Sequence, residues 1–340
     1  MGFEQTTLEG LEMSFWKNKS VLVTGATGLV GSWLVHELLK QGSNVTALVL
    51  DNDSSSQLFR SGDIDRISVV SGNLSSYHDV ARSMYTNECT EVFHLGAQTI
   101  VGTALLNPIS TFESNIRGTW NVLEAVRQSQ GLVKAVVVAS SDKAYGSSGN
   151  LPYLEDHPLH GDGPYDVSKY CTDLLAQSYG NTYSLPVTVA RCGNIYGGGD
   201  LNWSRIIPGT IRDLELKRQP VLRSDGTFIR DYVHVDDVVS GYMKLAEVTH
   251  EKKLNGEAFN FSRNEPISVK TLYEFVCLAT VGNYIEPQIL NTTKSEIKDQ
   301  HLDSTKAKSV LGWSSSVSIT DGLSKTVDWY RNYLLSNLNS

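Results

Sequence analysis

The sequence predicts an α/β protein built on a doubly wound parallel sheet. Short β-branched apolar runs recur along the first half of the chain, each followed by a turn and a stretch with helical periodicity. These runs are 20–25, 44–50, 67–72, 91–96, 134–140 and 186–191. They are continuously apolar rather than alternating, as strands are when helices cover both faces of a parallel sheet. Ligands of such sheets bind beyond the carboxyl ends of the strands.

Length and composition limit the classes of protein to consider. The chain has 340 residues, 40% of them apolar, which suits one large domain or two. A net charge of -8 argues against a general nucleic-acid or membrane-surface protein, because phosphate binding needs clustered excess Lys and Arg. No run of eighteen apolar residues predicts a membrane span.

The cysteines and the first residues bear on the compartment. Four cysteines are scattered without a C-x-x-C pair, which predicts neither a zinc site nor a disulfide framework. The first twenty residues lack the basic and apolar regions of a signal peptide. We therefore expect a cytoplasmic protein without a bound metal.

Two domains are expected. Residues 17–193 hold all six apolar runs and predict a dinucleotide-binding (Rossmann) domain. After Asn194 the pattern loosens into a Gly-rich loop and mixed short elements. Residues 194–335 are therefore predicted to form mostly a smaller substrate-binding domain, with some segments returning to the first domain.

Three glycines follow the first predicted strand. In "VLVTGATGLVGSWL", Gly25 allows a tight turn, Gly28 lets a phosphate approach the backbone, and Gly31 brings the next helix close to the sheet. The helix N-terminus then offers N–H groups and positive potential to a pyrophosphate. A glycine turn that merely ends a strand is the alternative interpretation.

An acidic residue ends the second strand. Asp51 lies twenty-six residues after Gly25, where a carboxylate can accept hydrogen bonds from both adenosine ribose hydroxyls and repel a 2'-phosphate. This position favours NAD over NADP, although a surface-loop role for Asp51 remains the alternative. The residues expected to contact NAD are Gly25, Thr27, Gly28, Leu29, Val30, Gly31, Asp51, Asn73, Leu74, Leu95, Gly96, Ala97, Gln98, Asn115, Tyr165 and Lys169.

A Y-x-x-x-K pattern begins a later helix. Tyr165 and Lys169 share one helix face, so the ammonium can lie near the phenol and lower its pKa toward the working range. The phenolate can then take a hydroxyl proton while hydride leaves carbon. The pattern is common by chance, and a helix start with an exposed lysine is the alternative. Ser141, which closes a strand twenty-four residues earlier, supports the catalytic interpretation.

Ordered motifs extend this pattern along the chain. "TGATGLVG", "HLGAQ", "ASSDKAYG", "YDVSK", "ARCGNIYGGGD", "RDYVHVDDV" and "LGW" together resemble the extended short-chain dehydrogenase/reductase family over about residues 17 to 335. The resemblance implies that Ser141, Tyr165 and Lys169 form a redox triad. It also implies that the substrates are nucleotide-activated sugars, whose diphosphate would meet Asn194, Arg205 and Arg230.

The residues after Ser141 suggest the reaction. "SSDKAY" is similar to the CDP-glucose 4,6-dehydratases of the family, in which an acid and a base occupy these positions. The resemblance implies a lyase of deoxysugar biosynthesis, with Asp142 as the acid and Lys143 as the base. A structural ion pair at a strand end is the alternative for these two residues.

Other functions stay open. Gly146 restores the "YG" found in epimerases and in other dehydratases of the family. A nucleotide-sugar 4-epimerase, which would use the same triad with Asp142 and Lys143 serving only for binding, is the closest alternative. A non-catalytic dinucleotide sensor belongs to another class, and such proteins commonly lose the tyrosine or lysine that this chain retains. Relatives form dimers through the helices that here follow Pro108 and Tyr165, and we expect a homodimer.

Two histidines invite a metal interpretation that we do not favour. His94 lies in an apolar strand, where a hydrogen-bonded core residue is expected. His234 stands among aspartates in "RDYVHVDD", but Asp236 or Asp237 is better explained as the N-cap of the helix that follows.

Overall fold

The structure is a computed structural model that describes residues 14–147, 149–292 and 297–338. The first thirteen residues, which contain most of the segment searched for a signal peptide, lie outside the described residues. Among the described residues, no helix combines the length and apolar character needed to cross a membrane.

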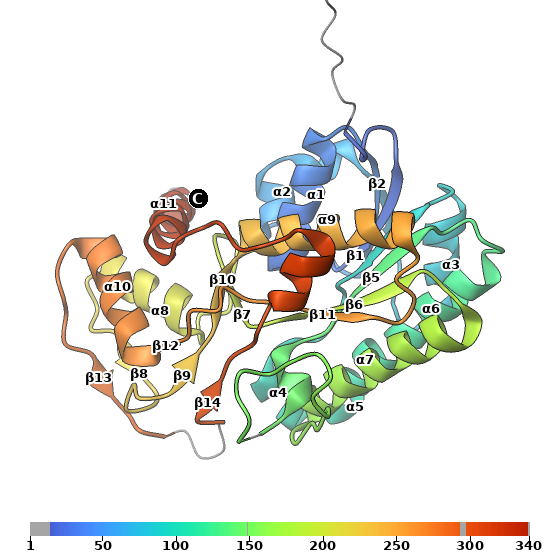
Figure 1. The fold of residues 1–340 in the computed structure, drawn as a ribbon. Coiled ribbons are helices and arrows are strands. Elements are labelled where there is room, and N and C mark those ends of the chain that lie inside the picture. Colours follow the sequence, from blue (N-terminus) through green and yellow to red (C-terminus); the bar gives the residue numbers. More distant parts are fainter. Residues whose placement is uncertain (1–13, 148, 293–296, 339–340) are drawn as a thin grey trace, which may run out of the picture.

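A seven-stranded parallel sheet forms the centre of the molecule, which confirms the predicted fold class (Figure 1). The strand order is β11-β6-β5-β4-β1-β2-β3. All six predicted runs form strands of this sheet. These six are β1 (Ser20–Thr24), β2 (Asn44–Val49), β3 (Ser68–Ser71), β4 (Glu91–His94), β5 (Ala135–Ala139) and β6 (Val187–Cys192), and the seventh strand is β11 (Ala258–Phe261). Because β2 and β4 lie on opposite sides of β1, the winding reverses there, and such points form ligand crevices.

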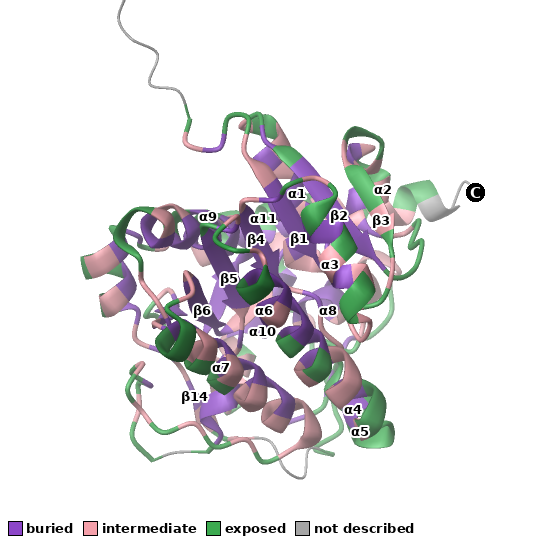
Figure 2. Ribbon diagram, turned by 90° about the vertical axis from the view of Figure 1, so that its right-hand side faces the viewer, coloured by how far each residue is buried: buried purple, intermediate pink, exposed green. Residues whose placement is uncertain are grey.

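Helices cover both faces of the sheet (Figure 1). One layer holds α1 (Leu29–Lys40), α2 (Gln57–Arg60) and α9 (Val235–Lys252). The opposite layer holds α3 (Tyr77–Tyr85), α6 (Gly118–Gln128) and α7 (Pro164–Tyr183). Each layer encloses its own apolar core against the strands. Figure 2 shows the inner strands of the sheet buried behind helices whose outer faces are exposed, while the edge strand β3 is mostly exposed.

The stretch expected to be one helix after Pro108 is instead divided. It contains α5 (Pro108–Phe112), a π-helical turn (Glu113–Arg117) and α6, and it is preceded by α4 (Val101–Leu106). Such π turns occur frequently at functional sites. Here the turn carries Asn115, which is almost fully buried.

A second group of elements lies beyond the carboxyl ends of the strands and has a separate apolar core (Figure 1). Its elements are β7 (Asn194–Tyr196), α8 (Ile206–Glu215), β8 (Val221–Leu222), β9 (Ile229–Arg230), β10 (Tyr232–His234), β12 (Ile267–Ser268), α10 (Val269–Val281), β13 (Gln288–Ile289), β14 (Asp299–Gln300) and α11 (Ile319–Leu338). The chain returns to the large sheet at α9 and β11, and the π-helical turn Ala307–Leu311 packs nearby. We propose that these returning segments belong to the first domain.

The cap expected for α9 was assigned to the wrong residue. The helix begins at Val235, and the side chain of His234 caps it by accepting a hydrogen bond from the Asp236 N–H at 3.2 Å. Asp237 lies in the first turn, where it accepts from the N–H groups of Ser316 at 2.9 Å and Val317 at 3.0 Å. The carboxylate therefore fixes a distant loop rather than the helix end.

Candidate active site

The glycine loop between β1 and α1 has the shape of a phosphate cradle. Gly25 adopts φ +73, and a Cβ there would lie 2.7 Å from the Gly96 nitrogen. A Cβ on Gly31 would lie 2.1 Å from the Gly25 oxygen, so this glycine is needed where the helix meets the loop. A Cβ on Gly28 would meet only the Gly25 oxygen, at 3.3 Å. Space therefore remains beside Gly28.

The start of α1 is free to receive an anion. Gly28 is its N-cap and makes no side-chain cap hydrogen bond, and no acidic residue lies in the first turn. Thr27, Leu29 and Val30 complete this loop and turn. The residues present therefore fit the pyrophosphate of a dinucleotide, which needs backbone N–H donors and close approach.

The other residues predicted to contact the cofactor gather at the ends of neighbouring strands. Asp51 and Asn73 are exposed just beyond β2 and β3. Leu74 packs against Gly96, where an added Cβ would lie 2.5 Å from its Cδ1. Leu95 and Ala97 flank Gly96 directly after β4.

Asn115 joins this strand edge to α7. Its Oδ1 accepts from the Gln98 N–H at 2.7 Å, and its Nδ2 donates to the Gln98 carbonyl at 3.0 Å and to the Ser168 Oγ at 2.8 Å. The asparagine therefore holds the loop after β4 against the helix that carries Tyr165 and Lys169.

His94 is a hydrogen-bonded core residue, as predicted. Its Nδ1 pairs with the Thr24 hydroxyl at 2.8 Å and its Nε2 with the Thr119 hydroxyl at 3.0 Å. Burial, with a smaller contribution from the charge of Lys169, lowers the pKa of His94 to about 3. The ring is therefore neutral at physiological pH. Separately, among the described residues no group of three or more His, Cys, Asp or Glu side chains could hold a metal ion.

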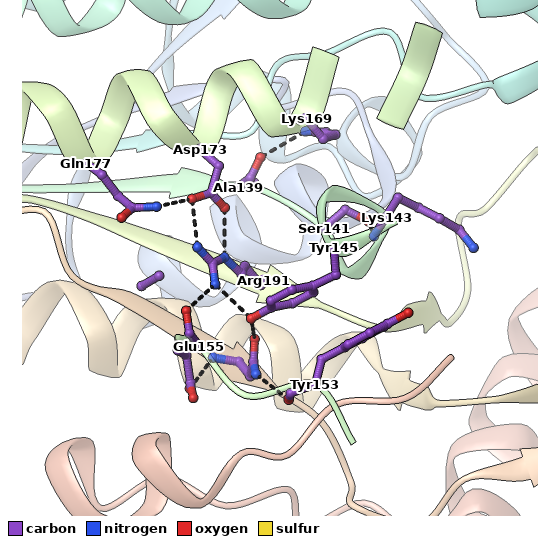
Figure 3. Close-up of polar contacts among 12 residues, drawn as sticks. Ala139, Ser141, Lys143, Tyr145, Tyr153, Glu155, Lys169, Asp173, Gln177 and Arg191 are labelled. Carbon is purple, nitrogen blue, oxygen red and sulfur yellow. Dashed lines mark hydrogen bonds and ion pairs between the residues drawn. The ribbon is translucent and has the colours of Figure 1, made fainter. Parts of the chain in front are cut away.

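The three residues predicted as a redox triad lie just after β5 and at the start of α7. Ser141 follows β5, while Tyr165 and Lys169 lie on the first turns of α7, which begins with Pro164 at a favourable N-terminal position. The Lys169 Nζ donates to the Ala139 carbonyl at 2.8 Å (Figure 3). Desolvation lowers the pKa of this buried lysine to about 8.

The pKa of Tyr165 differs from the expectation. Desolvation raises it to about 12, and the influences that lower it come from the charge of Arg205 and a hydrogen bond with Ser141, not from Lys169. Asp142 and Asp166 raise it further. The sequence pattern predicted that Lys169 lowers the pKa of Tyr165, but in this structure desolvation of the phenol outweighs the influence of nearby charges.

Asp142 and Lys143 point to different partners. Both belong to the 3-10 turn Asp142–Tyr145. Asp142 is 2% exposed; its Oδ1 accepts from the Ser141 hydroxyl at 2.9 Å, while its Oδ2 is buried without a hydrogen-bond partner among the described residues. The Lys143 ammonium instead donates to the Gln300 Oε1. This arrangement does not favour a simple ion pair between the two residues.

A buried polar network supports this turn from below (Figure 3). Arg191 of β6 donates to the Tyr145 hydroxyl at 2.7 Å and to the Glu155 carbonyl at 2.9 Å. The Tyr145 hydroxyl donates to Asn260 at 2.8 Å. Sequence reasoning missed this network, although a lone arginine inside an apolar strand is a signal, because a buried charge needs a partner.

The three residues predicted to bind substrate lie on the second group of elements. The Asn194 Nδ2 donates to the Asp231 carbonyl at 3.2 Å. The Arg205 guanidinium donates to Asp200 at 3.0 Å and stays 43% exposed. Arg230 is buried, and its guanidinium donates to the carbonyls of Ile229, Ile297 and Lys298.

A buried carboxyl next to Arg230 was also missed. Asp231 is fully buried, and its Oδ2 accepts from the Leu302 N–H at 3.4 Å. Desolvation raises its pKa to about 6, with a further contribution from the charge of Asp142. The candidate site therefore contains two buried carboxyls that influence each other.

Comparisons with known proteins agree with this geometry. The family model described as GDP-mannose 4,6 dehydratase matches residues 22–326. CDP-glucose 4,6-dehydratase of Salmonella typhimurium is 30% identical over 342 residues, which cover 95% of this chain and 94% of that protein. Among solved structures, UDP-glucose 4-epimerase of Thermotoga maritima has a TM-score of 0.83 and 28% identity, covering 93% of this chain and 99% of that one.

A second solved structure extends the likeness to an enzyme seen with its cofactor. The dTDP-glucose 4,6-dehydratase of Streptomyces venezuelae, solved with NAD bound, has a TM-score of 0.82 and 27% identity over 92% of this chain and 97% of that one. The matched family model and the relative at 30% identity show the family, and the glycine loop and the Ser141, Tyr165 and Lys169 positions agree with it. The chain belongs to the nucleotide-sugar 4,6-dehydratases and epimerases of the short-chain dehydrogenase/reductase family.

Proposed function

We propose that the protein is a nucleotide-sugar 4,6-dehydratase that converts a CDP-glucose-type substrate into a 4-keto-6-deoxy nucleotide sugar. The observation that carries this proposal is the arrangement of Asp142 and Lys143. Asp142 presents a buried oxygen with no partner among the described residues, and Lys143 points away from it toward Gln300. Two groups aimed at different atoms suit an elimination that needs an acid and a base at once.

The cofactor is NAD, which when bound would accept hydride from C4 and supply it again to C6. The cradle beside Gly28 supports this assignment, as does the solved dehydratase with NAD. Tyr165 would take the proton of the C4 hydroxyl, and Ser141 is among the groups that lower the pKa of its phenol. Asn194, Arg205 and Arg230 would bind the diphosphate, because a planar guanidinium can hold two phosphate oxygens.

The elimination follows from the acidity of C5 next to the C4 ketone. Lys143, as a neutral amine, would remove the C5 proton, and the released electron pair would form the C5–C6 double bond. The C6–O bond breaks, and the proton of Asp142 converts the leaving hydroxyl into water. After C6 is reduced, Lys143 would return a proton to C5. Asp142 must therefore carry a proton at the elimination step, and its unpartnered buried oxygen is the place for it.

The second candidate is a nucleotide-sugar 4-epimerase. It uses the same Ser141, Tyr165 and Lys169, and the structural likeness to a UDP-glucose 4-epimerase favours it. Asp142 and Lys143 would then serve only in binding. A non-catalytic sensor is a weaker candidate, because the protein keeps all three triad residues.

Variants of the acid and base separate these candidates. We expect Lys143→Ala and Asp142→Asn to retain C4 oxidation, seen as absorbance of the reduced nicotinamide, while the release of water falls by roughly 100-fold or more. Tyr165→Phe is the matched control, since it should stop oxidation as well. If Lys143→Ala releases water at the wild-type rate, the base is another residue.

We also propose a cytoplasmic homodimer. Trp120 on α6 and Leu174 and Tyr183 on α7 leave apolar surface exposed on the two helices expected at the interface. The described cysteines are all free, which suits a reducing compartment. Light scattering of the purified protein would measure the mass of the assembly, and the mass of a single chain would contradict a dimer.

A further inference from the structure

We propose that Gln300 is a positioning residue that holds the Lys143 amine in place as the base of the elimination. This inference rests on the proposed dehydratase function. Gln300 lies on β14, far from Lys143 in sequence, and its side chain is fully buried. It carries no chemistry of its own, so its role would be to fix the position and the protonation of Lys143.

Both ends of the Gln300 amide are bound. Its Nε2 donates to the Asp142 carbonyl at 3.0 Å, and its Oε1 accepts from the Lys143 Nζ. Because an amide nitrogen only donates and an amide oxygen only accepts, the bond to Asp142 directs the oxygen toward Lys143. One side chain therefore holds the backbone of the acid and the amine of the base together.

A neutral acceptor suits a base that must lose its proton. An amide oxygen accepts a hydrogen bond from an ammonium or from a neutral amine, whereas a carboxylate at this position would favour the ammonium. Two carboxyl groups lie near Lys143. Asp142 belongs to the same turn, and Asp166, at the start of α7, interacts with the Lys143 charge. On the β14 side the contact is Gln300, and a third carboxylate there would oppose deprotonation.

Gln300 also links the base to the strand expected to bind substrate. In the pairing of β14 with β9, Gln300 lies opposite Arg230. The Arg230 guanidinium donates to the carbonyls of Ile297 and Lys298, just before β14. A sugar diphosphate that binds Arg230 would therefore contact the strand pair that holds Lys143, which aligns the base with the bound sugar.

Two substitutions test this role. Gln300→Glu keeps the shape but adds a charge, and Gln300→Met keeps the volume but removes both hydrogen bonds. We expect both variants to oxidise C4 at near the wild-type rate and to eliminate water roughly 10-fold or more slowly at neutral pH. Elimination by Gln300→Glu should recover as the pH rises and frees the amine, whereas Gln300→Met should stay slow at every pH. Gln288→Glu, on the exposed strand β13, is the matched control.

The outcomes separate this inference from the proposed function. Wild-type elimination with an unchanged pH profile in either folded variant would overturn the role of Gln300 while leaving the dehydratase intact. If one variant fails to fold, the other still gives the pH profile that decides the matter. If the wild-type protein releases no water from any nucleotide sugar, the proposed function fails, and the role of Gln300 fails with it.

Discussion

Arg191 and Asp173 form a two-point ion pair next to the turn that carries Asp142 and Lys143. The Arg191 Nε lies 2.8 Å from the Asp173 Oδ2, and its Nη2 lies 2.9 Å from Oδ1. The arginine comes from β6 and the aspartate from α7, and both side chains are almost fully buried (Figure 3). The pair therefore ties the helix that carries Tyr165 to the sheet.

Removing one partner should be costly for stability. Asp173→Ala leaves the Arg191 charge buried and unpaired, and we expect a loss of about 3–5 kcal/mol in the free energy of unfolding. Denaturant unfolding measures this change. Lys40→Ala, which breaks an exposed pair with Glu37, should leave the unfolding midpoint nearly unchanged. Equal midpoints for the two variants would show that the buried pair contributes little.

Substitutions in the glycine loop should separate binding from folding. A Cβ at Gly28 needs only a small adjustment, so Gly28→Ala should fold but bind NAD roughly 10-fold more weakly, about the loss of one hydrogen bond to a charged group. Gly31→Ala places a methyl group against the Gly25 oxygen and should cost about 1–3 kcal/mol of stability. Calorimetric titration with NAD and thermal unfolding measure the two effects. Unaltered NAD affinity in Gly28→Ala would place the phosphates elsewhere.

Asp231 should make stability depend on pH. Its folded-state pKa of about 6 lies above the ordinary value of 3.8, so the folded protein holds this proton more tightly than the unfolded chain. The resulting stability is fully present below about pH 4 and is lost as the pH rises through about 6. The Asp231→Asn variant lacks this titrating group, so the wild-type protein should lose stability relative to the variant as the pH rises. Between about pH 4 and a pH well above 6, the free energy of unfolding of the variant should rise by about 3 kcal/mol relative to that of the wild type. Parallel stability curves for the two proteins would contradict a raised pKa.

Arg205 should assist the deprotonation of Tyr165. Its positive charge lowers a tyrosine pKa that burial raises, so Arg205→Ala should slow C4 oxidation by roughly 3- to 10-fold at neutral pH, even at saturating sugar. The pH profile should move to higher pH, which a pure loss of substrate affinity would not cause. Arg218 is an exposed arginine after α8, and Arg218→Ala serves as the control. A profile that stays in place would assign Arg205 to binding alone.

Local patterns were sufficient to predict the sheet and the tight glycine loop after its first strand. Continuous apolar runs predicted six of the seven strands, and three glycines located the cradle because their spacing reflects contacts within one turn. The contacts that surround the proposed acid and base were not predictable in this way. Gln300 lies on a strand of two residues, too short for any periodic signal, and its contacts with Asp142 and Lys143 cross more than 150 positions of sequence.

The pKa values of the site residues depend on how deeply each side chain is buried, and local sequence patterns do not specify burial. The spacing of Tyr165 and Lys169 suggested a lowered tyrosine pKa, but the tertiary structure desolvates the phenol and raises it. The cap of α9 was misjudged for a similar reason. Aspartate is the better N-cap by preference, yet Asp237 bonds to a loop about 80 positions away and leaves His234 to cap the helix.

Mass spectrometry of the purified protein incubated with single nucleotide sugars tests the proposed reaction most directly. CDP-glucose, dTDP-glucose, UDP-N-acetylglucosamine and GDP-mannose would be supplied separately with NAD. We predict that CDP-glucose loses the mass of one water and, in deuterated solvent, gains one deuterium at C5. If every mass stays unchanged while NMR shows a new C4 stereoisomer, the protein is an epimerase, and Asp142 and Lys143 do not act as acid and base.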